Sequence, residues 1–123
     1  MKDEVRGNWD LRKRTEQFAL DCIRLVEMIP QTIAGKHIGG QLLRASTSVA
    51  ANYRASRLAQ SKAGFIAKQS IVIEEADESE FWLDMLCKSK IFETEETARL
   101  KNEAHEIASI FISSRRTAQQ NKK

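Results

Sequence analysis

Proline and glycine are scarce in this chain. Its 123 residues contain one proline and five glycines, whereas an all-β sandwich or barrel shows a turn signal about every 8–12 residues. Aromatic residues make up 7% of the chain and hydrophobic residues 41%. This composition predicts long helices joined by a few loops, within one domain of ordinary size.

Long hydrophobic runs and a targeting signal are also absent. No segment approaches the roughly 18 consecutive apolar residues of a transmembrane helix, and the N-terminal residues lack the apolar region of a signal peptide. The two cysteines, Cys22 and Cys87, lie within apolar periodic segments. They are predicted to be buried free thiols rather than a disulfide or a catalytic cysteine. A cytoplasmic location is therefore expected.

The residues that metal binding or catalysis would require are missing as well. A di-iron bundle uses Glu-x-x-His pairs, but neither His37 nor His105 has a glutamate three residues before it. The glycines at 35–40 are not followed by the Gly-Lys-Ser/Thr ending of a phosphate-binding loop, and no Gly-x-Ser-x-Gly elbow is present. The sequence predicts a protein without enzymatic activity, metal or cofactor.

Four segments carry side chains that recur at the 4-3 spacing of a helix face. The four stripes are Leu11, Thr15, Phe18, Cys22, Leu25 and Ile29; Ile38, Leu42, Ala45, Val49, Asn52 and Ser56; Phe65, Gln69, Val72, Ala76, Ser79, Leu83 and Leu86; and Thr97, Leu100, Ala104, Ile107, Phe111 and Ser114. Pro30 ends the first stripe because proline clashes with the preceding helical turn. The glycine-containing segment 31–40 is expected to be a loop. Ser61 is predicted to cap the third helix, and the acids of 93–96 suit the start of the fourth.

These four segments and their short connections predict the fold. We expect an all-α, antiparallel up-down four-helix bundle. It should form a single domain over residues 1–123, with its core at about 10–116. Arg115 and Arg116 are expected to complement the negative C-terminal end of the last helix, and residues 119–123 to form a frayed tail.

Some apolar residues lie outside the four stripes. A helix that is apolar on more than one face is either buried on both or contacts another chain. One interpretation is a broad core within a single chain, and the other, which we adopt, is a homo-oligomer. The predicted interface residues are Leu43, Ala50, Tyr53, Ile71, Trp82 and Met85.

The net charge of +3 conceals a segregation of charge along the chain. No Asp or Glu occurs from Met28 to Ile73, and acids then accumulate from Glu74 to Asp84 without a base. Clustered bases give sequence-independent affinity for nucleic-acid phosphates. The candidate phosphate contacts are Arg44, Arg54, Arg57, Lys62 and Lys68. The alternative is a structural or protein-interaction scaffold, in which these bases pair with acids of a neighbouring helix or subunit.

A signature within the acid-free stretch resembles a known family. The run at 41–52, Gln-Leu-Leu-Arg-Ala-Ser-Thr-Ser-Val-Ala-Ala-Asn, resembles the Gln-Leu-x-Arg-Ala-x-x-Ser-Ile/Val-x-x-Asn signature of four-helix-bundle proteins named for intervening sequences in bacterial 23S ribosomal RNA genes. Many members continue with Ile-Ala-Glu-Gly, whereas this chain has Tyr-Arg-Ala-Ser at 53–56. The usual acid is therefore absent, and a base, Arg54, stands one residue before its position.

Other parts of the chain support the same resemblance. Pro30 stands about ten residues before the signature, as in the family, and Phe65-Ile66 followed by Glu78-x-Glu80 is similar to its helix-3 pattern. The similarity extends over 11–114, most of the chain.

The resemblance implies an assembly and a set of partners. Family members are bundles that form a homopentameric ring or barrel, with no established enzymatic activity. A related branch comprises accessory variability proteins of diversity-generating retroelements, basic pentamers that bind nucleic acid and associate with a reverse transcriptase. The resemblance therefore implies copies of the chain itself, RNA or DNA, and a reverse transcriptase as candidate partners.

Overall fold

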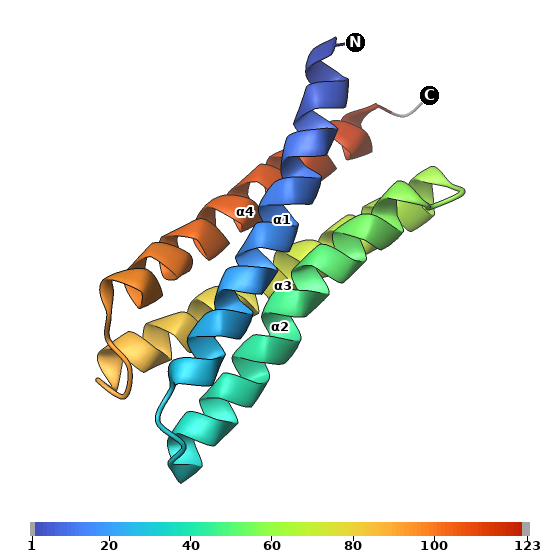
Figure 1. Ribbon diagram of the computed structural model, residues 1–123. Coiled ribbons are helices and arrows are strands. Elements are labelled where there is room, and N and C mark those ends of the chain that lie inside the picture. Colours follow the sequence, from blue (N-terminus) through green and yellow to red (C-terminus); the bar gives the residue numbers. More distant parts are fainter. Residues whose placement is uncertain (1, 122–123) are drawn as a thin grey trace.

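Four α-helices span the residues 2–121 that the computed structural model describes, with side chains described from Leu11 to Asn121 (Figure 1). They are α1 (Lys2–Met28), α2 (Ile33–Arg57), α3 (Lys62–Lys88) and α4 (Glu95–Gln120). No strand occurs between residues 2 and 121. The all-α prediction, with its four helices, is confirmed.

Hydroxyl side chains begin three of the helices. Thr32, Ser61 and Thr94 each accept a hydrogen bond from the backbone amide three residues further on, at 3.0–3.1 Å. Such caps satisfy amides that have no partner within the helix. The cap predicted at Ser61 is confirmed, and Glu95 and Glu96 occupy the first turn of α4 as expected.

The start of α2 differs from the prediction. Residues 31–40 were expected to form a loop, but the helix begins at Ile33 and includes the glycines. A Cβ atom at Gly35 would overlap the carbonyl oxygen of Pro30. At Gly39 the nearest atom to a Cβ would belong to Val26 of α1. The distance between them, 3.5 Å, is an ordinary contact, so Gly39 is not required to be glycine. Gly35 is, because the Pro30 carbonyl oxygen in the α1–α2 connection leaves no room for a side chain, and this explains a glycine within the helix despite its poor helix propensity.

The core confirms the four stripes of the sequence. Their members are buried, except for five that are partly buried: Leu11, Ile38, Asn52, Phe65 and Ser114. Phe18 of α1 and Phe111 of α4 are the largest fully buried side chains. Polar stripe residues are accommodated by bonds to their own helix, as when Ser79 Oγ donates to the Glu75 carbonyl oxygen at 2.8 Å.

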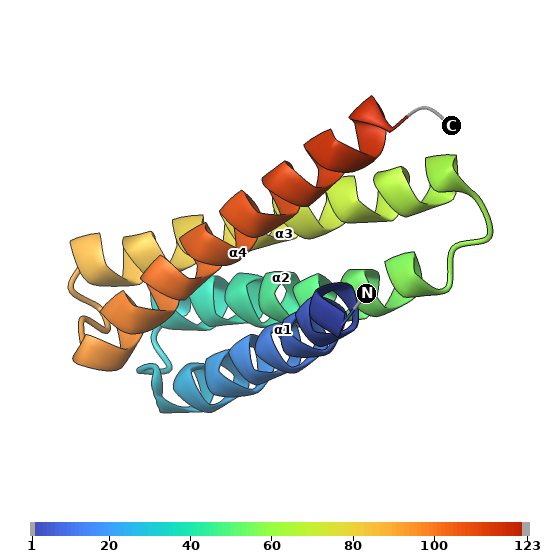
Figure 2. The same ribbon diagram turned by 90° about the horizontal axis from the view of Figure 1, so that it is seen from above.

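The helices pack in two layers, with α1 beside α2 in one and α3 beside α4 in the other (Figure 2). Each helix packs against the next in the chain, and α4 returns to α1 through the smallest contact. The α2–α3 connection lies at the same end of the bundle as both chain termini (Figure 1). The end of α2, the start of α3 and the end of α4 therefore meet at this end. Within residues 2–121, no helix has the length and apolar character that crossing a membrane requires.

The end of α4 also departs from the prediction. The helix continues through Gln119 and Gln120, which were expected to belong to a frayed tail. Its last turn contains no basic residue, so Arg115 and Arg116 do not complement the helix end. Residues 122 and 123 of the expected tail lie outside the described residues.

Candidate nucleic-acid interface

Two acid-free segments meet where α2 is connected to α3. One is the stretch that ends at Ile73, and the other is 107–121, the last turns of α4. Arg115 links them, because its guanidinium donates a hydrogen bond to Ser70 Oγ of α3 at 3.1 Å. We call the bases gathered here the basic end: Arg54, Arg57, Lys62, Lys68, Arg115 and Arg116.

Four of the five predicted phosphate contacts belong to the basic end. Arg54, Arg57 and Lys62 are exposed, and Lys68 is partly buried. Among the described side chains, no carboxylate lies within ion-pair distance of any of the four. Their charge is therefore not offset by a contact with any of those carboxylates.

Arg44 is in a different environment. It points from α2 to α3, where its guanidinium contacts Glu75 at 3.1 Å and also contacts Glu78. Hydrogen bonds from Arg44, and a second from Trp82 Nε1 at 3.1 Å, hold the pKa of Glu78 below its usual range. Arg44 thus forms the inter-helix ion pairs that the alternative interpretation describes, and it is not part of the basic end.

The six residues predicted at an oligomer interface lie in different environments. Tyr53 is only 3% exposed and packs edge-on against Phe111, with ring centroids 5.3 Å apart. Its side chain belongs to the core of one chain. Leu43 is 38% exposed. The other four are partly buried: Ala50, Ile71, Trp82 and Met85.

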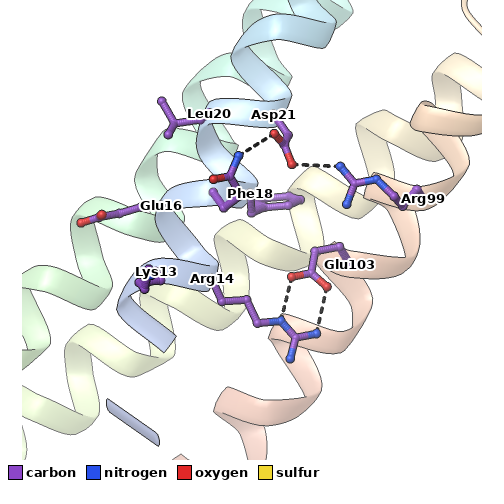
Figure 3. A pocket seen from close by; sticks show the side chains of 9 residues that line it. Lys13, Arg14, Glu16, Phe18, Leu20, Asp21, Arg99 and Glu103 are labelled. Atoms are coloured by element: carbon purple, nitrogen blue, oxygen red, sulfur yellow. Dashed lines mark hydrogen bonds and ion pairs between the residues drawn. The ribbon is translucent and has the colours of Figure 1, made fainter. Parts of the chain in front are cut away.

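A groove of about 480 Å³ separates α1 from α4, with Phe18 among its lining residues (Figure 3). Ion pairs cross it: Arg14 makes two hydrogen bonds to Glu103, at 2.7 and 2.8 Å, and Arg99 contacts Asp21 at 2.9 Å. These bases are already matched by acids. The groove is therefore a less suitable anion site than the basic end.

The described side chains include two free thiols but no metal-binding cluster. No group of three or more His, Cys, Asp or Glu that could hold a metal ion occurs among them. Both cysteines are free thiols, as predicted, with Cys22 buried and Cys87 partly buried. Burial raises the pKa of Cys22 to about 12, so it remains a protonated thiol at neutral pH.

Sequence reasoning missed two members of the basic end. Arg115 and Arg116 were assigned to the end of a helix, although the segment from Ile107 onward contains no acid before Asn121. That absence was a usable signal. In an up-down order of helices, the end of the fourth helix lies beside the start of the third. The acid-free last turns of the fourth helix are therefore expected beside the acid-free start of the third.

The chain resembles known proteins over most of its length. It matches the family described as 23S rRNA-intervening sequence protein over residues 8–113. Among solved structures, it is similar to a protein of unknown function from the S23 ribosomal protein family of Bacteroides thetaiotaomicron VPI-5482. The two are 30% identical with a TM-score of 0.75, and the match covers 84% of this chain and 95% of that one. No curated protein matches the chain.

Proposed function

Because this chain belongs to the 23S rRNA-intervening sequence protein family, we propose that it is a non-enzymatic, homo-oligomeric bundle that binds RNA or DNA through its basic end. The observation that supports this most is the convergence of two acid-free segments on one end of the fold. At least four of the bases there have no carboxylate partner among the described side chains.

The expected contacts are to phosphates rather than to base edges. Exposed Lys and Arg side chains position a nucleic-acid backbone through its phosphates but do not read its sequence. If the six bases neutralised six phosphates, the affinity for duplex DNA would fall about 10³-fold between about 50 and 200 mM salt. Each copy alone is expected to bind nucleic acid weakly. In an oligomer, binding of one copy raises the effective concentration of nucleic acid at the others, so the overall affinity increases.

The proposed assembly follows the resemblance of the sequence to its family. The subunit is an antiparallel up-down bundle, and five copies form a cytoplasmic ring that associates with a reverse transcriptase, as an accessory protein of a diversity-generating retroelement. Exposed apolar side chains on α1 and α2 support self-association, since Leu20 is 48% and Leu43 38% exposed. Light scattering tests the assembly: a Leu43→Arg variant should be smaller than the wild type, and a monomeric wild type at micromolar concentration would refute the ring.

The binding experiment compares two arginines of the same helix. Single- and double-stranded RNA and DNA are titrated with wild type, Arg57→Gln and the matched control Arg44→Gln over a salt series. Each variant loses one charge, but only Arg44 is held by carboxylates of the same chain. Arg57→Gln should weaken binding several-fold and reduce the salt slope by about 0.9 on duplex DNA, whereas Arg44→Gln should change affinity less than about twofold.

Two results would contradict the proposal. If the wild type binds none of the four nucleic acids at low salt, the function is wrong. If both variants lose affinity equally, net charge alone explains the binding and the basic end is not the site.

The scaffold remains the second candidate, because the Arg44 pairs with Glu75 and Glu78 show that α2 bases can hold helices together. An Arg54→Gln/Arg57→Gln/Lys62→Gln variant that dissociates the oligomer would support it.

A further inference from the structure

A second cavity opens between α1 and α2 at the basic end. Its volume is about 330 Å³, at the lower end of the range for small-molecule sites. Arg12 and Thr15 of α1 line it, together with Tyr53, Arg54 and Arg57 of α2 and Leu58 just beyond. A space of this size suits a single nucleotide and is too small for a folded segment of nucleic acid.

Three arginines line this cavity, which makes it suited to a phosphate. Arginine presents its N–H groups in a planar fork that matches phosphate oxygens two at a time. Glu16 is the one carboxylate among the described lining residues, and it contacts Arg12 at 3.4 Å. With three arginines and one glutamate, these side chains carry a formal charge of +2.

The remaining wall supplies neutral groups. Burial raises the pKa of Tyr53, and the nearby Arg57 only partly opposes this, so the phenol stays uncharged at neutral pH. Thr15 is 1% exposed and its hydroxyl donates to the Leu11 carbonyl oxygen at 2.8 Å. Leu58, which is 74% exposed, stands beside the arginines as an apolar surface.

We propose that this cavity binds one terminal nucleotide of a nucleic-acid strand, with its phosphate monoester held by Arg12, Arg54 and Arg57 and its sugar or base against Leu58. The proposal deepens the proposed function and rests on it. A phosphate monoester carries a charge of about −1.5 to −2 at pH 7, which matches the formal charge of the lining, whereas an internal phosphodiester carries only one negative charge. A phosphate at the end of a strand can also enter a concave site directly, whereas a phosphate within the strand could enter only if the strand bent.

The experiment compares ends of otherwise identical strands. A short single-stranded oligonucleotide, labelled at its opposite end, is prepared with a 5′-phosphate, with a 3′-phosphate and with hydroxyl ends only. Each is titrated with the full chain at fixed salt, and AMP is used as a competitor. A phosphorylated end should tighten binding about tenfold, as expected for charge-assisted hydrogen bonds to one added group.

Three variants separate the cavity from the rest of the basic end. Arg57→Gln should remove the preference for a phosphorylated end. Glu16→Gln should increase it, because it removes a carboxylate from the lining and releases Arg12. Lys62→Gln is the matched control: it lies on the basic end but does not line the cavity, so it should weaken all strands equally and leave the ratio unchanged.

The outcomes distinguish this proposal from the function on which it rests. If wild type binds phosphorylated and unphosphorylated strands equally, the cavity proposal is overturned and binding by the basic end stands. If AMP binds but no strand does, the source of the phosphate monoester is a free nucleotide and the proposed strand terminus is wrong. If neither AMP nor any strand binds, both the cavity proposal and the proposed function are overturned.

Discussion

Replacing Gly35 with alanine should destabilise the protein, although alanine is the better helix former by about 0.5–1 kcal/mol. The added methyl group would overlap the Pro30 carbonyl oxygen and lie 3.1 Å from Thr32 Oγ1. Overpacking of this kind costs about 1–3 kcal/mol. Displacing Thr32, which caps α2, costs about 1 kcal/mol more. The net loss in the free energy of unfolding should therefore be about 1–3 kcal/mol.

The same helix provides a matched control. A Cβ atom at Gly40 would meet no atom of the described residues within 4 Å, so only the helix propensity changes and Gly40→Ala should stabilise the protein by about 0.5–1 kcal/mol. For 123 residues, the entropy of unfolding converts about 1 kcal/mol into about 4 °C of melting temperature. Gly35→Ala should lower Tm by about 4–12 °C, and Gly40→Ala should raise it by about 2–4 °C.

Thermal unfolding followed by far-UV circular dichroism measures both variants. Protein concentration is kept constant and the oligomeric state is checked by sizing, because association shifts the apparent Tm. If Gly35→Ala melts at or above the temperature of Gly40→Ala, the close approach of the Pro30 carbonyl oxygen is not what requires glycine, and the reasoning is refuted.

Three other substitutions test individual contacts. Gln69 is 3% exposed and its Oε1 has no hydrogen-bond partner among the described residues, so Gln69→Met should raise the free energy of unfolding in urea by about 1 kcal/mol; no gain would mean that the amide is satisfied in solution. Arg44 lowers the pKa of Glu78 in the folded state, so this carboxylate stabilises the fold above its ordinary pKa and the effect is lost as the pH falls through the lower folded value. The difference in stability between wild type and Glu78→Gln should accordingly disappear in acid, and a difference independent of pH would contradict the pairing. A double-mutant cycle on Arg14 and Glu103, which form two hydrogen bonds, should give a coupling energy of about 0.5–1 kcal/mol that decreases with salt; a coupling of zero would show that the pair is not formed in solution.

The helices and their buried faces were predictable because their signals are local. A 4-3 spacing places side chains on one face whatever lies opposite, and Thr15, Ser79 and Thr97 are buried as the stripes predict. The N-cap at Ser61 is likewise a property of a few neighbouring residues. Gly35 misled the prediction because glycine often marks a loop, whereas here it stands within a helix at a position where the Pro30 carbonyl oxygen leaves no room for a side chain.

The sequence predicted which segments of the candidate site are basic, but not which bases are paired with acids. The sequence by itself determined that the bases of residues 28–73 have no acid among them and that the acids follow in a block. It did not determine which base meets which acid, because Arg44 and Arg54 have the same chemistry and belong to the same helix. That depends on the rotation and axial position of α3 against α2, which set Arg44 opposite Glu75 and Glu78.

The tertiary structure alone also brought Arg115 to the start of α3 and gathered Arg12, Arg54 and Arg57 around one cavity. The physical reason is the same in each case. The periodicity of a helix encodes which of its faces is buried. The charge of a surface is instead a sum over helices that are distant in the chain, and only their packing decides which charges are cancelled.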